Sequence, residues 1–571
     1  MEKQLRSGDW FARKGKIGFI YRAWMKNQGI PDYEFSHKPV IGICNTWSEL
    51  TPCNAHFREL AESVKRGVSE AGGFPVEFPV MSLGETLMKP TAMLYRNLAS
   101  MDVEESIRAN PIDGVVLLCG CDKTTPSLVM GACSVNLPTI VVSGGPMLTG
   151  RHNGRSVGTS DVWRFHDDLR ENKINEEELV TIEGAMCRSR GHCAVMGTAS
   201  TMACMVESLG LSLPGNAAIP AADSRRKVLA QLSGLRIVEM VRENMKLSDV
   251  LKREAFENAI KVNAAIGGST NFIIHLLAIA GRIGVPLDIK DFDTLSANIP
   301  LIVNLQPSGT FFMEDLFYAG GLQAVIKELD NILNPGCITV NGKTLKENYD
   351  SAASTFDRKV IATTDEPFSD AGGLAVLKGN ICENGAVIKP SAASPHLMKH
   401  TGKAIVFENI DEYKNIIDDD SLEVDENNIL VLKNVGPKGY PGMPEVGNMG
   451  VPKKLLVKGI HDMIRISDGR MSGTGFGTVV LHVSPEAALG GNFAVIKTGD
   501  MITLDVPNRT LNVEVSEEEL NKRKAAFTPL PPVAERGYVQ MYINHVQQAH
   551  LGTDLDFLVG SSGSAVTKDS H

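Results

Sequence analysis

Ten cysteines are spread along the 571-residue chain, and three of them stand in polar loops where a thiolate could bind a metal. Cys53 lies in LTPCNAH, Cys121 in CGCDKTTP and Cys193 in RGHCAVMGTAS. Cysteines within apolar helical stretches, such as Cys133 and Cys204, are instead typical of core packing. No C-x-x-C pair occurs, so zinc-ribbon and thioredoxin-like sites are not supported. Spacing alone leaves metal binding and simple packing both open for the loop cysteines.

Acidic residues stand beside these loops or directly after predicted strands. Asp122 and Lys123 follow Cys121, Glu85 lies in SLGETLMKPT, and Glu445 lies in GYPGMPEVGNMG. Hard cations such as Mg²⁺ are bound by carboxylate oxygens drawn from separate loops. For any one of these carboxylates, plain solvation is the alternative. A thiol next to a carboxylate suggests that a soft metal and a hard metal bind close together.

Two glycine-rich segments could bring the backbone close to a ligand. The segment ISDGRMSGTGFG (466–477) surrounds Ser472 and Thr474 with small residues. A phosphate cradle or a flexible turn would fit the same pattern, but the segment matches neither G-x-S-x-G nor a P-loop, which argues against an esterase or an NTPase. A Gly-Ser-Thr turn enters an apolar helix within 263–284, and the N-terminus of that helix could hold an anion or carry an ordinary cap.

The elements that must position these residues alternate between strand and helix in the first half of the chain. The patterns predict a strand over 39–44, a helix over 54–73, an extended segment over 74–84 and a helix over 101–109, followed by strand, loop, short helix and strand over 113–145. This order predicts a parallel sheet with right-handed crossovers. Ligands bind at the carboxyl ends of such strands, so the loop 120–126 is well placed for chemistry.

The sequence pattern changes near residue 365. From there on, short strand-like runs are separated by Gly, Asn, Asp and Pro. We therefore expect an α/β protein with two domains. Residues 1–365 would form a parallel-sheet α/β domain that carries the cysteines and most of the carboxylates. Residues 366–571 would form a β-rich, barrel-like domain that carries Glu445 and the Ser472 loop.

Composition limits the class of protein. The net charge of −10 argues against a nucleic-acid partner held by a broad basic field. No apolar run approaches the roughly 20 residues that a membrane helix needs, so no membrane partner is expected. The opening MEKQLRSGDWFARKGK has no apolar segment behind its charges, so no secretory signal is visible. The cysteines are too sparse for a disulfide scaffold, which favours a cytoplasmic protein with reduced thiols.

Taken together, these motifs resemble the IlvD/Edd family of dehydratases along almost the whole chain. The matching segments are NTWSELTPCNAHFRELA, CDKTTPSLVMG, GTASTMA, AIGGSTN, KPSAASPH, GPKGYPGMPEVGNMG, SDGRMSG, HVSPEAALGG and VPNR. CDK-x-x-P and DGR-x-S-G are highly specific in combination. SDGRMSGTG and GHCAVMGTAS depart from the segments usual in the dihydroxy-acid dehydratases, and look like those of the pentonate branch, which acts on L-arabinonate or D-xylonate.

The resemblance implies a role for each residue that matches a family motif. The iron–sulfur ligands would be Cys53, Cys121 and Cys193. The pentonate branch favours a [2Fe–2S] cluster, and [4Fe–4S] is the alternative within the family. The Mg²⁺ ligands would be Glu85, Asp122, Glu445 and a carbamylated Lys123. Ser472 would be the catalytic base beside Lys123, and Thr474 and the terminal His571 would contact the substrate. The family also suggests a homodimer or a homotetramer.

The implied reaction is that of a hydro-lyase. It removes water from a small-molecule aldonate, such as L-arabinonate or D-xylonate, and yields a 2-keto-3-deoxy acid through an enol. Three cysteine ligands would leave one iron position free for the C3 hydroxyl, and Mg²⁺ would neutralise the charge that develops when the C2 proton leaves. The alternatives are a dihydroxy-acid dehydratase of branched-chain amino-acid synthesis and a non-catalytic metal- or anion-binding protein.

Overall fold

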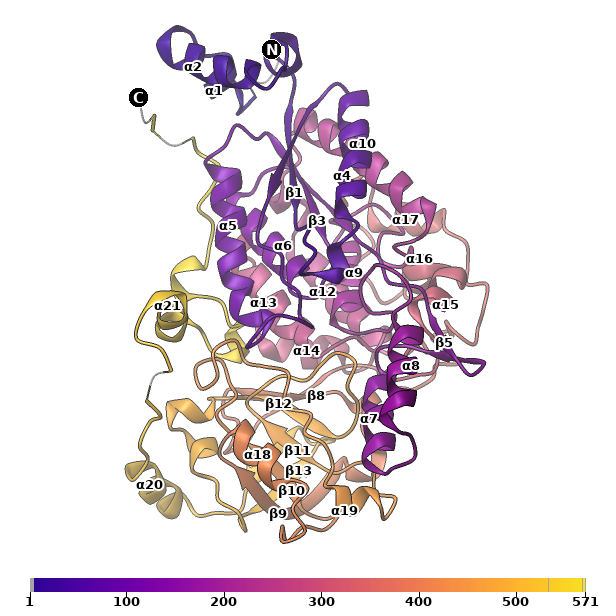
Figure 1. Cartoon of the computed structure of the whole chain (residues 1–571), viewed down its shortest axis with the longest axis vertical. Helices are drawn as coiled ribbons and strands as arrows, with labels where there is room; N and C mark the ends of the chain where they lie inside the picture. The colour runs from indigo at the N-terminus through magenta and orange to yellow at the C-terminus, as the bar shows by residue number, and fades with distance from the viewer. Residues whose placement is uncertain (1–4, 532, 567, 570–571) are drawn as a thin grey trace.

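The structure is a computed structural model that describes residues 5–531, 533–566 and 568–569. Within those residues the strands form a four-stranded sheet, an eight-stranded sheet and a two-stranded hairpin. The first sheet and its helices lie above the second sheet in Figure 1. The predicted fold class, a parallel-sheet α/β part followed by a β-rich, barrel-like part, is confirmed.

The N-terminal sheet is parallel throughout, as the alternation of strands and helices predicts. In pairing order its strands are β2 (Phe74–Pro79), β1 (Val40–Asn45), β3 (Gly114–Cys119) and β4 (Thr139–Ser143). The connecting helices are α4 (Phe57–Glu70), α5 (Arg96–Arg108) and α6 (Thr124–Val135). Because carboxyl ends of parallel strands share one edge, the segments that follow β1, β2 and β3 all leave the sheet at that edge.

Close helix packing covers this sheet. Leu60 and Val64 lie on one buried face of α4, at the four-residue spacing that places side chains on the same side of a helix. Helix α10 (Ser224–Glu243) packs against α4 where a Cβ on Gly67 would lie 2.0 Å from the carbonyl oxygen of Gln231. Glycine is therefore needed at this crossing, because any side chain would hold the two backbones apart.

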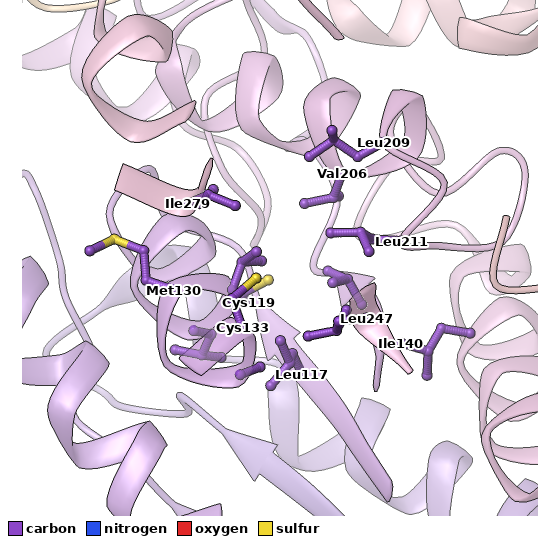
Figure 2. Close-up of a cluster of buried hydrophobic side chains, with 14 of the residues drawn as sticks. Leu117, Cys119, Met130, Cys133, Ile140, Val206, Leu209, Leu211, Leu247 and Ile279 are labelled. Carbon is purple, nitrogen blue, oxygen red and sulfur yellow. The ribbon is translucent and has the colours of Figure 1, made fainter. Parts of the chain in front are cut away.

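A hydrophobic core lies between the sheet and its helices (Figure 2). It includes Cys119 of β3 and Cys133 of α6. Burial raises the pKa of each of these two thiols to about 12, so both are protonated at neutral pH. Cys204, in α9 (Thr198–Ser208), is equally buried. The interpretation of Cys133 and Cys204 as core residues is confirmed.

The Gly-Gly-Ser-Thr turn also forms where the sequence predicts it. It joins α12 (Arg253–Ala265) to α13 (Asn271–Ile283). Gly267 in this turn has a φ of +61°, a left-handed conformation that glycine adopts without strain. Helix α13 is buried along most of its length, although residues 263–265 belong to the preceding helix rather than to the turn.

The C-terminal sheet is mixed and curls toward closure. In pairing order its strands are β14 (Thr510–Val513), β13 (Met501–Asp505), β9 (Lys399–Phe407), β10 (Ile429–Leu432), β11 (Arg465–Ser467), β12 (Val479–Ser484), β8 (Gly385–Ile388) and β7 (Ala375–Leu377). The central strands β9 to β12 are parallel and the outer ones antiparallel. A bridge between Lys378 and Thr510 joins the two edges, so the sheet is nearly a closed barrel.

A segment of the first half reaches across to the second half. It contains the hairpin of β5 (Gly150–His152) and β6 (Arg155–Val157), and then α7 (Asp161–Arg170) and α8 (Glu176–Met186). Helix α7 lies beside the C-terminal sheet in Figure 1. Its last residue, Arg170, forms an ion pair of 2.6 Å with Asp418, which follows α18 (Ile410–Ile416).

The C-terminal part of the chain returns to the first half. Helix α21 (Gly537–His545) lies near α5 in Figure 1. The buried guanidinium of Arg282 pairs with Asp554 at 2.6 Å and with Glu104 at 3.1 Å. Residues near 554 therefore pack on the N-terminal half, and the predicted boundary at residue 365, which lies in an irregular stretch, stays a prediction.

The other helices lie around these two parts. They are α1 (Gly8–Phe11), α2 (Gly15–Lys26), α3 (Asp32–Phe35), α11 (Leu247–Val250), α14 (Ile289–Ser296), α15 (Met313–Tyr318), α16 (Gly321–Glu328), α17 (Leu345–Asp350), α19 (Lys453–Leu456) and α20 (Glu517–Ala525). Among the residues that the structure describes, no helix combines the length and apolar character needed to cross a membrane.

Candidate active site

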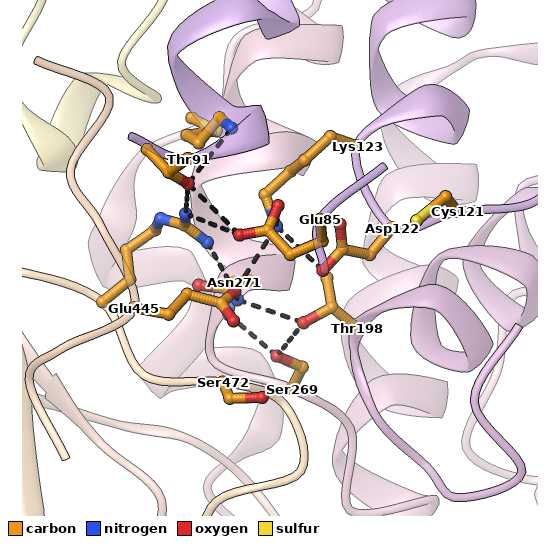
Figure 3. A network of polar contacts seen from close by, with 12 residues as sticks. Glu85, Thr91, Cys121, Asp122, Lys123, Thr198, Ser269, Asn271, Glu445 and Ser472 are labelled. Carbon is orange, nitrogen blue, oxygen red and sulfur yellow. Dashed lines mark hydrogen bonds and ion pairs between the residues drawn. The ribbon is translucent and has the colours of Figure 1, made fainter. Parts of the chain in front are cut away.

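A buried lysine brings together the predicted carboxylate ligands. Lys123 follows the loop after β3 and caps α6, and its side chain has no exposed surface. Its Nζ lies 3.0 Å from Asp122 Oδ2, 3.5 Å from Glu445 Oε1 and 3.6 Å from Glu85 Oε2 (Figure 3). The structure thus unites four of the predicted residues, and Glu445 comes from the C-terminal half of the chain.

Local hydrogen bonds hold Glu85 and the loop of Glu445 in place. Thr91 Oγ1 donates to Glu85 Oε1 over 3.2 Å. The loop that carries Glu445 pairs with the Asp-Gly-Arg segment through the backbone, since the Gly447 N–H donates to the Arg470 carbonyl over 2.8 Å and the Arg470 N–H donates to the Pro444 carbonyl over 3.2 Å. Glu445 and the Ser472 loop are therefore held as one unit.

Burial and neighbouring charges together set the pKa values of the buried groups at the site. Burial by itself would raise the pKa of Glu85, but the positive charges of Lys123 and Arg470 outweigh it and lower that pKa. Burial raises the pKa of Asp122 to about 7, and the negative charges of Glu85 and Glu445 add to the shift while Lys123 opposes it. Burial and Arg470 act to lower the pKa of Lys123, yet the three carboxylates raise it overall.

Two carboxylate oxygens at this site are buried without a hydrogen-bond partner among the described residues: Glu85 Oε2 and Asp122 Oδ1. Buried polar atoms are normally satisfied, so such oxygens are suited to bind a hard cation. The ammonium group of Lys123 lies among the carboxylates. Consistent with this, no group of three or more His, Cys, Asp and Glu side chains in the described chain converges on one point as a ready-made cation site. Lys123 itself could contribute oxygen ligands only after carbamylation.

The three predicted cysteine ligands lie near one another and near Asp122, although they too do not form a ready-made metal site among the described residues. The thiols of Cys53 and Cys121 are hydrogen-bonded, and this contact and burial, with the fields of Cys121 and Cys193, raise the pKa of Cys53 well above its usual value. Burial and the field of Cys121 raise the pKa of Cys193 to about 12, although the nearby hydroxyl of Thr159 opposes the shift. The side chain of Asn54 accepts from the Cys121 N–H over 3.1 Å and ties two of the loops together. The three buried or half-buried thiols are therefore protonated as they stand, and only a bound metal would favour their deprotonated form.

The Ser472 loop lies against the start of α9. A Cβ on Gly473 would lie 2.3 Å from the Thr198 nitrogen, so this contact needs glycine. The hydroxyl oxygens of Ser472 and Thr474 are 2.9 Å apart, and the Thr474 N–H donates to Ser472 Oγ over 3.3 Å.

Sequence reasoning missed two residues that organise Glu445. Arg470, fully buried, donates to Glu445 Oε1 over 2.7 Å and to the Met443 carbonyl over 2.6 Å. Asn271, the first residue of α13, donates to the same carboxylate oxygen over 2.8 Å. Both stand inside motifs that resemble those of the family, DGRMSG and AIGGSTN, so the motifs contained the signal. This bond comes from the side-chain amide of Asn271 and not from the backbone N–H groups of the helix, so an anion held by the helix N-terminus stays a prediction.

The last predicted residue, His571, lies outside the described residues. Near the end of the described chain, Asp569 forms an ion pair of 2.6 Å with Arg13. The proposed contact between His571 and the substrate therefore stays a prediction.

Both halves of the chain match one family of dehydratases. Residues 38–348 match the N-terminal model of the dihydroxy-acid/6-phosphogluconate dehydratases, and residues 359–553 match the C-terminal model. The chain is 58% identical to L-arabonate dehydratase of Azospirillum brasilense, over 100% of this chain and 99% of that protein. It is 55% identical to L-arabinonate dehydratase of Rhizobium leguminosarum bv. trifolii over the same shares.

A relative of the other substrate class is more distant. Dihydroxy-acid dehydratase of Caldicellulosiruptor bescii is 40% identical over 95% of this chain and 99% of that protein. The family models cover both halves that meet at Lys123 and Glu445, and the full-length identities leave no large part of the chain unmatched. On these grounds the chain belongs to the dihydroxy-acid/6-phosphogluconate dehydratase family.

Proposed function

We propose that this protein is a hydro-lyase that dehydrates a sugar acid, L-arabinonate or a similar aldonate, to the 2-keto-3-deoxy acid. The observation that carries the proposal is the full-length identity of 55–58% to two proteins named for L-arabonate or L-arabinonate, against 40% to a dihydroxy-acid dehydratase. The proposed reaction removes the C2 proton and the C3 hydroxyl, which leave together as one molecule of water.

A cavity of about 500 Å³ touches the end of the Ser472 loop at Phe476, and Asp161, Arg164, Gln306 and His461 are among its lining residues. None of the proposed metal ligands lines it, and neither does Ser472 or Thr474. The polyhydroxylated substrate is therefore inferred from the names of the similar proteins. A site that offers hydrogen bonds to the C4 and C5 hydroxyls of a pentonate would strongly disfavour an alkyl substrate, which lacks those hydroxyls and would leave the polar groups of the site unpaired.

Two metal groups fit the residues at the site. Glu85, Asp122, Glu445 and a carbamylated Lys123 would hold Mg²⁺, and the orphaned oxygens of Glu85 and Asp122 support this assignment. Cys53, Cys121 and Cys193 would hold an iron–sulfur cluster, [2Fe–2S] in preference to [4Fe–4S]. When bound, Mg²⁺ would supply Lewis acidity at the substrate carboxylate and C2 hydroxyl, and iron at the C3 hydroxyl.

The side chains of this protein would supply the proton transfer. Ser472 would accept the C2 proton, and it needs help because a free serine hydroxyl is a very weak acid. Thr474 offers that help, since its N–H and its hydroxyl both lie within hydrogen-bond distance of Ser472 Oγ. Arg470 and Asn271 would keep the Glu445 carboxylate oriented toward Lys123.

A substrate panel tests the function directly. Enzyme purified without oxygen and supplied with Mg²⁺ is assayed with L-arabinonate, D-xylonate and 2,3-dihydroxyisovalerate, with Ser472→Ala as the control. We expect turnover of L-arabinonate with a kcat/KM at least about 100-fold above that for 2,3-dihydroxyisovalerate. Faster turnover of 2,3-dihydroxyisovalerate would favour branched-chain synthesis. Protein without visible iron–sulfur absorbance and without turnover of any substrate would favour the non-catalytic alternative.

We also propose that the protein works in the cytoplasm, as a homodimer or a homotetramer. The sparse cysteines, all of them free thiols, support a reducing compartment. Light scattering coupled to size-exclusion chromatography would give the oligomeric mass, for comparison with 61.7 kDa for one chain.

A further inference from the structure

A tryptophan from the first half of the chain contacts the loop of the proposed base. Trp163 lies in the first turn of α7, and its indole Nε1–H donates to Thr474 Oγ1 over 3.1 Å. Thr474 Oγ1 lies in turn 2.9 Å from Ser472 Oγ. Three side chains thus form one hydrogen-bonded row, although Trp163 and Thr474 are 311 positions apart in the sequence.

Helix α7 is held at both ends, so the indole is a fixed partner. At its start, the Gly158 N–H donates to Asp161 Oδ2 over 2.8 Å. At its end, Arg170 pairs with Asp418 at 2.6 Å and donates to the Val451 carbonyl over 3.1 Å, both in the C-terminal half. The helix therefore bridges the two halves of the chain at the side of the Ser472 loop.

The chemistry of the indole fixes the direction of the first hydrogen bond in this row. An indole N–H can only donate a hydrogen bond, so Thr474 Oγ1 must accept from Trp163. The single hydroxyl proton of Thr474 is then free to point at Ser472 Oγ, the other close partner of that oxygen. Ser472 Oγ would receive this bond together with the one from the Thr474 N–H at 3.3 Å. Two donors directed at one oxygen favour its anionic form.

We propose that Trp163 is a positioning residue for the base, because its indole N–H orients the Thr474 hydroxyl as a donor to Ser472 Oγ. The proposal rests on the proposed role of Ser472. Trp163 would act through Thr474 alone, without contact to the reacting atoms. Its effect should therefore fall on kcat rather than on KM.

Kinetics of matched variants test this role. Trp163→Phe removes the N–H and keeps an aromatic ring. We expect kcat to fall about tenfold while KM stays within about twofold. This fall in kcat is smaller than the 10²–10³-fold loss typical of removing a donor that bonds the reacting oxygen directly. Thr474→Val should lower kcat further, and Thr474→Ser should restore most of it. The double variant Trp163→Phe/Thr474→Val should be no slower than Thr474→Val. Trp24→Phe, at a tryptophan that is 67% exposed, is the matched control and should resemble wild type.

A spectroscopic measurement separates this proposal from the proposed function. The chain has four tryptophans, so protein labelled with 5-fluorotryptophan should give four fluorine resonances, and Trp163→Phe identifies one of them. Thr474→Val should shift that resonance and leave that of Trp24 unchanged. If Ser472→Ala kept a normal kcat while Thr474→Val still shifted the Trp163 resonance, the role of Ser472 as base would be refuted but the Trp163–Thr474 hydrogen bond would stand. Wild-type kcat in Trp163→Phe, or effects of Trp163→Phe and Thr474→Val that multiply in the double variant, would overturn the positioning role.

Discussion

The Nζ of Lys123 and the Oε1 of Glu445 lie 3.5 Å apart although 322 positions separate the two residues in the sequence. Lys123 stands at the carboxyl edge of the N-terminal sheet, and Glu445 is carried by a loop of the barrel-like half. The site is therefore complete only when the two halves of the chain pack together.

Lys123→Arg should abolish tight Mg²⁺ binding, because arginine keeps the positive charge but cannot be carbamylated. We expect at least a tenfold loss of Mg²⁺ affinity by calorimetry. Wild type exposed to ¹³C-bicarbonate should also show a carbamate carbon resonance that the variant lacks. Lys346→Arg, at a partly exposed surface lysine, is the control. Mg²⁺ affinity that stayed normal in Lys123→Arg would remove Lys123 from the ligand set.

Gly473→Ala should disable the site while most of the fold remains. The new Cβ would lie 2.3 Å from the Thr198 nitrogen, so the Ser472 loop must move away from the start of α9. We expect kcat to fall by about 100-fold or more, since small misplacements of reacting groups are that costly. Gly184→Ala, at a helical glycine with nothing within 4 Å of the new Cβ, should have no effect on kcat. Comparable kcat values in the two variants would contradict the proposed position of the loop.

Lys389 should make stability rise with pH in the alkaline range. Its side chain is buried and donates to the Gly267 carbonyl over 2.6 Å, and burial lowers its pKa from 10.5 to about 7. Between about pH 7 and 10.5 the unfolded chain binds more protons than the folded chain, so the free energy of unfolding increases with pH, by up to about 1.4 kcal/mol per unit.

Urea denaturation of wild type and Lys389→Met at several pH values measures this contribution. Relative to the variant, wild type should gain stability from pH 7 to 9. The exposed Lys290, changed to Met, should show a constant difference from wild type over the same range. A constant difference for Lys389→Met as well would show that this lysine has an ordinary pKa in the folded protein.

Asp554→Asn should loosen the attachment of the C-terminal segment to the first half. The change removes one of the two carboxylates that neutralise the buried guanidinium of Arg282. Breaking a buried ion pair from one side typically costs about 3–5 kcal/mol, and the remaining pair with Glu104 should reduce the loss to about 2–3 kcal/mol. Asp556→Asn, at an exposed carboxylate two residues later, should change the free energy of unfolding by less than about 0.5 kcal/mol. Equal effects of the two variants would contradict the role of the buried pair.

Much of the fold could be predicted because its signals are local. The unbroken apolar runs of β1, β3 and β4 are buried at every position, which is the pattern of a parallel sheet covered on both faces. The glycine pair at the end of the predicted helix 54–73 follows the last residue of α4, where the chain bends. The glycine-rich turn before α13 likewise marks a place where one helix has ended and the next begins. The loop of Cys121, Asp122 and Lys123 could be placed at the functional edge because strand direction is set by the order of elements.

The fold class, the family and the residue types available for chemistry follow from the order of amino acids alone. Which of these residues meet depends on how the distant segments pack. Arg470 and Asn271 converge on Glu445, and Trp163 reaches Thr474, through contacts between segments 25, 174 and 311 positions apart. Hydrophobic periodicity reports which face of an element is buried, but it carries no information about which distant side chain that face will touch. Those partners depend on how the two halves of the chain pack.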